Sequence, residues 1–377
     1  MKKISFLMLH LNYGGIEKQV TTLANNLCND YEIEIISLYD LLNGRSFYNL
    51  NSKIKIKFIF DFGPNKSEII TSLKKFKLLD VFKELYKSIK ILYIKYFGIK
   101  KIVDKLNTDV VVSSRIEFSK QIRKIKGILT ISQEHSYIDS KKYISKVKKS
   151  FRGISYLVVM TNKAKEKYEM WLKWVKKKPK IVVIPNIINE NKENRISSLE
   201  HNQLISIGRL EDVKDFSTLI DMYYEIQKKN DNVTLKIIGE GSKRQELENK
   251  VSKLKIKDKV TFTGKLEEKN ICEELLKSNI FVLTSKCESF SLVLCEAMNY
   301  GVPCVSFDID VGPREIIDDK INGYLIKNRN IVNMQEKVEL LLNNYEIRKE
   351  LGKNAFKKAK KFYPSQIVGM WKKIIGD

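Results

Sequence analysis

The sequence from Ile280 to Ile317, IFVLTSKCESFSLVLCEAMNYGVPCVSFDIDVGPREII, carries the clearest fold signal in the chain. It opens with an apolar, β-branched run at 280–283, which is typical of a buried parallel strand. A polar turn follows, and then apolar residues at near-helical spacing predict a helix that begins near Phe290. A Gly-x-Pro step at 301–303 stops this helix and leads into a second apolar strand. This order predicts an α/β domain with a parallel sheet.

Two carboxylates, Glu288 and Glu296, flank the start of the expected helix. Glu296 lies about two turns into it, roughly 9 Å along the axis at 1.5 Å per residue. The unpaired N–H groups near Ser291 and Leu292 lie between the two acids and suit a phosphate. Ligands of open α/β sheets bind at the carboxyl ends of strands. The arrangement suits a sugar joined through a diphosphate to a ribose, although a lone pair of glutamates is more commonly just solvated.

The run E-SFSLVLC-E followed by AMNYGVPCV resembles the E-x7-E signature of the family 4 retaining glycosyltransferases. The resemblance is strong over 203–327 and looser over 1–186. It implies the GT-B fold, an α/β architecture of two Rossmann-like, doubly wound domains facing a central cleft. It also implies that a sugar moves from a nucleotide-sugar to an acceptor hydroxyl with retention. The resemblance further implies that Glu288 contacts the donor sugar at the catalytic centre and that Glu296 contacts the nucleotide ribose.

Alternating strand and helix patterns along the chain predict two domains. By the resemblance, residues 1–186 form the acceptor-side domain and residues 203–360 bind the nucleotide-sugar. The polar stretch 187–202 is interpreted as a linker. A final helix within 361–377 is expected to return to the first domain, as in other GT-B proteins. In the stretch 73–106, apolar residues recur every three or four positions, which predicts a long helical segment.

The first predicted strand ends in a turn that contains Gly14 and Gly15. Adjacent glycines allow a backbone to approach a ligand, although a simple tight turn explains them equally well. His135 follows a later predicted strand, at the edge where ligands bind. The resemblance favours a role for both features. It implies that Gly14 and Gly15 lie beside the donor phosphates and the acceptor, and that His135 lies near the reacting sugar.

Arg209 and Lys214 lie in the loop after the first strand of the second domain. Two cations at a strand end suit a diphosphate, Arg through its planar fork and Lys as a point charge. The IGRL-x3-K arrangement resembles the diphosphate-binding loop of the family. Because protein cations take this role, we expect no metal ion and no cofactor.

The net charge of +24 predicts an anionic partner. We expect the basic, aromatic-rich first domain to contact an anionic membrane surface and to collect a lipid-linked saccharide acceptor. The opening residues are interpreted as a strand, and no apolar run approaches the ~20 residues that a membrane span needs. The cysteines show no CxxC spacing. The expected location is therefore cytoplasmic, on the inner face of the plasma membrane. The aromatic residues expected at this membrane-contacting surface are Phe76, Tyr86, Tyr93, Tyr96, Phe97, Tyr143, Phe151, Tyr168, Trp171 and Trp174.

Three functions compete. A bacterial glycosyltransferase of cell-surface polysaccharide or glycan synthesis, with a UDP-sugar as the expected donor, fits both the motifs and the charge. A soluble GT-B enzyme that makes a small glycoside, or a phosphorylase, fits the motifs and leaves the charge unexplained. A non-enzymatic nucleic-acid-binding protein fits the charge alone, and we expect no nucleic-acid partner because the bases are not arranged as a reader motif.

Overall fold

The computed structural model describes residues 1–123, 125–135 and 138–376, with Lys66 and Ser67 described by their backbone alone. The chain divides into two compact units. The first comprises Met1–Ile187 together with Val368–Asp377, and the second comprises Ile188–Ile367. Within the described ranges, every helix falls short of the length and apolarity that a membrane-spanning segment needs.

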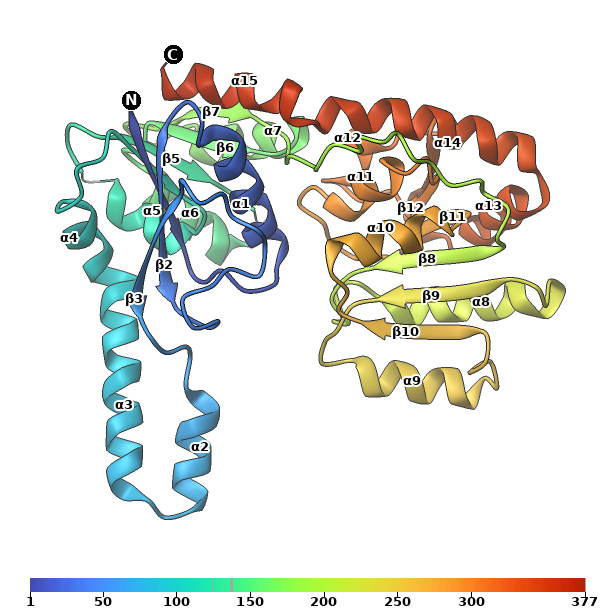
Figure 1. Ribbon diagram of the computed structural model, residues 1–377, viewed down its shortest axis with the longest axis horizontal. Coiled ribbons are helices and arrows are strands. Elements are labelled where there is room, and N and C mark those ends of the chain that lie inside the picture. Colours follow the sequence, from blue (N-terminus) through green and yellow to red (C-terminus); the bar gives the residue numbers. More distant parts are fainter. Residues whose placement is uncertain (124, 136–137, 377) are drawn as a thin grey trace. The chain divides into compact units, whose positions relative to one another are not determined.

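The described part of the first unit contains a sheet of seven parallel strands in the order β3-β2-β1-β4-β5-β6-β7 (Figure 1). From β1, the chain adds β2 and β3 on one side and then β4 to β7 on the other, so the order reverses between β1 and β4. This reversal is the place where doubly wound sheets bind ligands. The strands are β1 (Lys3–Met8), β2 (Glu32–Tyr39), β3 (Lys55–Phe60), β4 (Val110–Ser113), β5 (Leu129–Gln133), β6 (Tyr156–Val159) and β7 (Lys180–Val183).

Parallel neighbours require a long connection, which contains at least one helix everywhere except between β2 and β3, where residues 40–54 cross without one. Most of β1 and all of β4 are buried, as expected of central strands. The helices of this unit are α1 (Gly15–Leu27), α2 (Lys66–Lys74), α3 (Leu78–Tyr93), the π-helical turn η1 (Ile94–Gly98), α4 (Ile99–Val103), α5 (Ile116–Ile122), α6 (Lys141–Phe151), α7 (Asn162–Leu172) and the C-terminal part of α15 (Pro364–Ile375).

The long helical segment predicted over 73–106 is wrong in one respect, because the structure divides it. Phe76 adopts a left-handed conformation (φ 52°) between α2 and α3. This reverses the chain, and α2 and α3 form a hairpin that extends away from the sheet of the first unit (Figure 1). The apolar periodicity is real, but most of its side chains face solvent along the hairpin.

The described part of the second unit has a sheet of six parallel strands in the order β10-β9-β8-β11-β12-β13 (Figure 1). Here the order reverses between β8 and β11, which pair directly. Every residue of β11 and β12 is buried, which explains their continuous apolar sequences. The strands are β8 (Gln203–Ile207), β9 (Thr234–Ile238), β10 (Val260–Gly264), β11 (Ile280–Leu283), β12 (Cys304–Phe307) and β13 (Gly323–Ile326).

The second unit alternates these strands with helices and ends in a helical segment. Its helices are α8 (Phe216–Lys229), α9 (Arg244–Lys253), α10 (Glu268–Leu276), α11 (Leu292–Met298), α12 (Pro313–Ile316), the 3-10 turn η2 (Lys327–Arg329), α13 (Ile331–Asn343), α14 (Tyr345–Ala359), the 3-10 turn η3 (Lys360–Phe362) and the start of α15.

The stretch interpreted as a linker belongs to the second unit from Ile188 onward. The Asn191 amide donates to the carbonyl of Asn299 (2.9 Å), and the Ser197 hydroxyl donates to the carbonyl of Ser278 (2.8 Å). These polar side chains therefore fasten the stretch to its unit. At the other end of the chain, Lys372 of α15 pairs with Asp30 of the first unit (2.9 Å).

Candidate active site

The loops after β8 and β11 meet at the strand reversal of the second unit. The Lys214 Nζ atom donates to Oε1 of Glu288 over 2.5 Å, and the Ser285 hydroxyl donates to the same oxygen over 2.7 Å. Both side chains of the ion pair are mostly buried, at 18% and 9% exposure. The predicted cation and the predicted acid thus form one constellation at the carboxyl ends of neighbouring strands.

Three further residues, which the sequence did not single out, hold these two loops together. The Thr284 hydroxyl donates to the carbonyl of Asp215 (2.9 Å). Arg329 donates to the Asp215 carboxylate (2.5 Å) and to the carbonyl of Ser285 (2.8 Å). A polar Thr-Ser pair directly after a buried strand was the available signal for Thr284, whereas Arg329 is distant in sequence and gave none.

Arg209 lies on the same loop, and its side chain is exposed. Backbone hydrogen bonds fix its neighbours, since Gly208 donates to Ile238 and Leu210 donates to Glu240, both over 2.9 Å. A Cβ atom at Gly241 would lie 2.3 Å from the Leu210 carbonyl oxygen, so only glycine permits this approach of two backbones. The guanidinium has no ion pair with any carboxylate in the described residues, which leaves it available for an anion.

The loop that contains Gly312 packs directly against the Glu288 loop. A Cβ atom on Gly312 would lie 3.1 Å from Cβ of Glu288 and 3.2 Å from the carbonyl oxygen of Phe290. Its φ of 101° is also one that side chains rarely adopt. Gly312 therefore helps to set the position of the Glu288 backbone.

The expected helix begins at Leu292, two residues later than predicted, because Ser291 precedes it in a left-handed conformation (φ 74°). Ser291 is buried, and its hydroxyl has no hydrogen-bond partner among the described residues. Glu296 lies in the second turn of α11 and is partly exposed. Ser291, Leu292 and Glu296 thus follow Glu288 on one short loop and helix.

The glycines of the first unit lie at the start of α1, where Gly14 is the N-cap and Gly15 the first helical residue. A Cβ atom at Gly15 would meet nothing within 4 Å, so this backbone borders open space. The loop follows β1, beside the strand reversal of this unit. The position leaves room for a ligand against the backbone.

His135 follows β5, and its Nε2 atom is buried without a hydrogen-bond partner in the described residues. Burial, and then the positive charge of Arg115, lower the pKa of this imidazole from 6.5 to about 3. His135 is therefore neutral at neutral pH, and it has one N–H to donate. Such a group can donate a hydrogen bond to a substrate oxygen without bringing a positive charge.

Glu134, the residue before His135, accepts a hydrogen bond from the Tyr143 hydroxyl. Burial and the charge of Glu134 raise the pKa of Tyr143 well above its usual value, so this phenol stays protonated. Tyr143 also lies 3.3 Å from the Tyr168 hydroxyl. The hydrogen bond from Tyr143 to Glu134 joins α6 to the loop on which His135 lies.

A buried acid missed by the sequence analysis, Glu17, lies on α1 near the glycine turn. Its Oε1 atom is 3.5 Å from Nδ1 of His10 and 3.7 Å from Nη2 of Arg115. Burial and the Arg115 charge lower the pKa of His10. The sequence signal for this residue was an acid in the first turn of an apolar helix. Acids are common at helix N-termini in any case, so the signal was not specific.

Comparison with known proteins agrees with this architecture. A family model described as "Glycosyl transferases group 1" matches residues 188–358. A Campylobacter jejuni α-1,4-N-acetyl-D-galactosaminyltransferase, whose name specifies an undecaprenol diphosphate-linked saccharide, is 31% identical over 388 residues. The match covers 100% of this chain and 99% of that protein. The amylovoran biosynthesis glycosyltransferase AmsD of Erwinia amylovora is 24% identical, over 97% and 96% of the two chains.

Solved structures share the whole fold. Staphylococcus aureus TarM, in a complex that contains UDP, matches with a TM-score of 0.75 and 17% identity over 100% of both chains. Anabaena HepE with UDP and glucose matches with a TM-score of 0.74 and 15% identity, also over 100% of both chains. These matches confirm the predicted α/β class and GT-B architecture. The chain belongs to the glycosyltransferases, with the GT-B fold and a glycosyl transferases group 1 domain.

Proposed function

We propose that the protein transfers a sugar from a nucleotide-sugar, with UDP as the expected nucleotide, to a hydroxyl of a lipid-linked saccharide. The binding of the donor is supported mainly by the Lys214–Glu288 ion pair at the strand reversal of the second unit. The exposed Arg209 lies on the same loop as Lys214. The acceptor class rests on the lipid-linked saccharide named for the Campylobacter relative. UDP is supported by its presence in the two structural neighbours.

The geometry of the ion pair gives each residue a task. An ammonium has three N–H donors, and Glu288 takes one of those on Lys214, so the others remain for a phosphate oxygen. Both hydrogen bonds to Glu288 reach Oε1, which leaves Oε2 to accept from a hydroxyl of the donor sugar. Arg209 adds a second cation for the diphosphate. Preorganised cations stabilise the negative charge that develops on the leaving diphosphate.

The remaining assignments follow the family resemblance. Ser291 and Leu292 contact the donor diphosphate, and the buried Ser291 hydroxyl without a described partner supports this. Glu296 binds the ribose. Gly14 and Gly15 border phosphate and acceptor, as the open space at Gly15 allows. Neutral His135 donates a hydrogen bond to the reacting sugar or its leaving phosphate, and transfer proceeds with retention, as in family 4.

The proposed reaction needs no metal ion, because Arg209 and Lys214 supply the positive charge that the diphosphate requires. Transfer assayed after dialysis against EDTA tests this part of the proposal. Undiminished activity is expected, whereas a complete loss that Mn²⁺ restores contradicts it.

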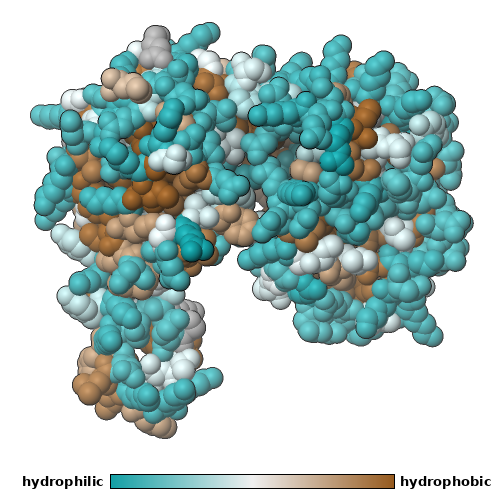
Figure 2. Space-filling view, viewed as in Figure 1, coloured by the Kyte–Doolittle hydropathy of each residue, from teal (hydrophilic) through white to brown (hydrophobic). Residues whose placement is uncertain are grey.

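We propose that the first unit contacts the membrane through a smaller surface than the full set of aromatic residues predicted from the sequence. Phe151, Tyr168 and Trp171 are at most 5% exposed, so the prediction that they belong to a surface of aromatic residues is wrong. The α2–α3 hairpin instead exposes Phe76 (90%) and Leu79 (86%), and Figure 2 shows apolar residues beside hydrophilic ones at its tip. The exposed apolar residues of the hairpin are Ile70, Leu73, Phe76, Leu78, Leu79, Phe82, Leu85, Tyr86, Ile89, Leu92 and Tyr93.

Lysines accompany this apolar surface, including Lys83 on its exposed face and Lys90, whose ammonium lies 4.6 Å from the Tyr86 ring centroid. Apolar and basic side chains on one helical surface suit the interface of an anionic membrane. We therefore place the enzyme on the inner face of the plasma membrane. The hairpin favours a lipid-linked acceptor over a small soluble one.

The experiment that tests the function incubates the purified protein with UDP-, GDP- and ADP-sugars and a lipid-linked saccharide. Product mass identifies the sugar that is added, and the anomeric configuration of the product tests retention. Transfer to the lipid-linked saccharide supports the proposal. Transfer to small soluble acceptors alone supports the competing function, a soluble glycoside-forming enzyme.

A further inference from the structure

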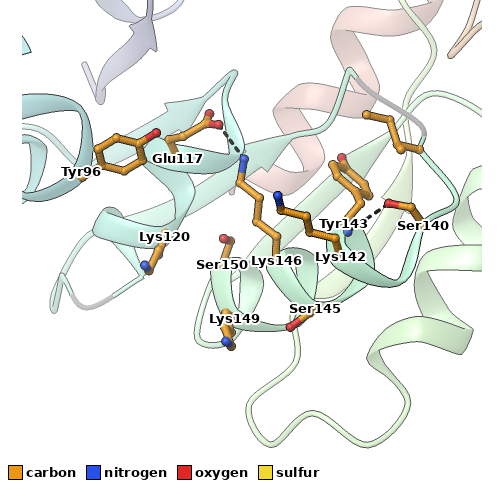
Figure 3. Close-up of a pocket in the computed structure, with 11 residues that line it drawn as sticks. Tyr96, Glu117, Lys120, Ser140, Lys142, Tyr143, Ser145, Lys146, Lys149 and Ser150 are labelled. Atoms are coloured by element: carbon orange, nitrogen blue, oxygen red, sulfur yellow. Dashed lines mark hydrogen bonds and ion pairs between the residues drawn. The ribbon is translucent and has the colours of Figure 1, made fainter. Parts of the chain in front are cut away.

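A pocket of about 650 Å³ lies in the first unit, apart from the candidate residues described above. Its wall is formed by α5, α6, residues 138 and 140 ahead of α6, and Tyr96 of η1 (Figure 3). Four lysines and a single glutamate are its charged lining residues, so the pocket is strongly basic. The four are Lys120, Lys142, Lys146 and Lys149.

The lysines of α6 divide according to the face on which they lie. Lys142, Lys146 and Lys149 are spaced by four and three residues, which places them on one side of a helix. All three line the pocket, whereas Lys141 and Lys148 of the same helix do not. One basic face of α6 therefore lines the pocket. The other lysines of α6 lie outside the pocket and provide a matched control set.

The charge in the pocket is only partly neutralised. Lys146 donates to Glu117 over 2.6 Å. Burial raises the pKa of Glu117, but the hydrogen bond and charge of Lys146 outweigh this, and the net effect is a lowered pKa. Lys120, Lys142 and Lys149 form no ion pair within the described residues. Three lysine charges therefore remain for a ligand.

Hydroxyl groups in the same wall add neutral donors. Ser150 is fully buried, lines the pocket, and has a hydroxyl without a hydrogen-bond partner in the described chain. A buried unpaired hydroxyl is costly unless a ligand or water satisfies it. Ser145 also lines the pocket. Lysines with serine hydroxyls form the donor set that phosphate oxygens accept from.

Two neighbours connect the pocket to the proposed function. Tyr96 lies on η1, which continues directly from α3 of the exposed hairpin. Tyr143, on the opposite part of the wall, hydrogen bonds to Glu134, the residue before His135. The pocket therefore lies between the base of the proposed membrane-contacting element and the loop of the proposed catalytic histidine.

We propose that this pocket binds the phosphate groups of the lipid-linked acceptor, holding its diphosphate while the saccharide reaches His135. The inference rests on the proposed function. A phospholipid headgroup offers the same phosphate chemistry, so the test must separate these two sources.

The test compares two double variants of equal charge on one helix, Lys142→Gln/Lys149→Gln inside the pocket and Lys141→Gln/Lys148→Gln outside it. Calorimetric titration with inorganic pyrophosphate, in saturating UDP to occupy the donor site, measures phosphate binding without any transfer. Steady-state kinetics give kcat and the KM for the lipid-linked acceptor. Sedimentation with phosphatidylglycerol vesicles measures binding to phospholipid.

The inside variant is expected to weaken pyrophosphate binding and to raise the acceptor KM by about 10- to 100-fold, since each charged hydrogen bond contributes appreciably. Its kcat is expected to stay near that of the outside variant, which is expected to resemble wild type. Equal effects of both variants would overturn the inference. Reduced vesicle binding with an unchanged acceptor KM assigns the pocket to phospholipid and overturns the acceptor assignment. Absence of transfer by the wild-type protein would instead contradict the proposed function.

Discussion

Lys214 and Glu288 are 74 positions apart in the sequence, yet the lysine Nζ atom lies 2.5 Å from Oε1 of the glutamate. The contact joins the loop after β8 to the loop after β11, the two strands between which the sheet order reverses. Ser285 also hydrogen bonds to that oxygen, and Arg329 fixes the surrounding backbone. The pair is therefore positioned before any ligand arrives.

Arg209→Gln is expected to raise the KM for the nucleotide-sugar and to lower kcat, together by about 10²-fold or more in kcat/KM, because a diphosphate loses one of its two cations. Thermal stability is expected to change little, since the side chain is exposed. Lys257→Gln, at another exposed position of the same unit, is the charge-matched control. Equal kinetics for both variants would show that Arg209 does not contact the donor.

Gly312→Ala is expected to destabilise the second unit by about 1–3 kcal/mol, because φ is 101° and the new Cβ would crowd Glu288. Activity is expected to fall as Glu288 shifts. Gly15→Ala is the contrasting change, since its Cβ would meet nothing within 4 Å. Unfolding in urea should separate the two. A Gly312→Ala protein as stable and active as wild type would contradict the packing described.

The neutral state of His135 makes a prediction about stability at low pH. In the unfolded chain an ordinary histidine binds a proton below pH 6.5, whereas folded His135 resists protonation down to about pH 3. The unfolded state then binds more protons, so stability falls as the pH decreases through this window. The loss is expected to reach about 1.4 kcal/mol per pH unit.

His135→Asn is expected to flatten this dependence between pH 6.5 and 4, as measured by urea unfolding at each pH. Arg115 and Glu134, the nearby charged groups, and the contacting residues His10 and Glu17 are unchanged in this variant. The exposed His201, replaced by Asn, is the control. An unchanged slope in His135→Asn would mean that the imidazole is protonated in the folded protein.

Leu79→Ser/Phe82→Ser, on the exposed face of α3, is expected to reduce sedimentation with phosphatidylglycerol vesicles by about 10-fold or more, because each buried apolar side chain contributes roughly 1.5–3 kcal/mol. The matched control is Ile321→Ser/Val332→Ser, which changes two exposed apolar residues of the second unit. Added salt should weaken binding of the wild-type protein. Equal binding by both variants would exclude the hairpin as the contact surface.

The second unit was the more predictable from sequence. The strand β11 begins and ends where its apolar run does, since a strand buried on both faces leaves a continuous signal. The resemblance indicated Glu288 and Lys214, and the structure places them in contact. Their supports, Ser285 and Arg329, were missed because a supporting residue is defined by proximity in space and has no motif of its own.

The first unit was less predictable. The break at Phe76 lies in a sequence rich in lysine and apolar residues, without the glycine or proline that usually marks a turn. The hairpin also violates the rule that apolar periodicity indicates a buried face, because its apolar side chains are exposed. The cluster of buried Glu17 with the partly exposed His10 and Arg115 assembles from three separate segments, and no local pattern indicates it.

Transfer of sugar from the identified donor to a lipid-linked saccharide, compared between wild type, Glu288→Gln and Lys286→Gln, tests the central claim most directly. Glu288→Gln keeps the shape of the side chain and removes the charge that pairs with Lys214. The account predicts a loss of at least about 10²-fold in kcat for this variant, with an unchanged circular dichroism spectrum and with normal turnover by the Lys286→Gln control. Turnover by folded Glu288→Gln at the wild-type rate would contradict the account.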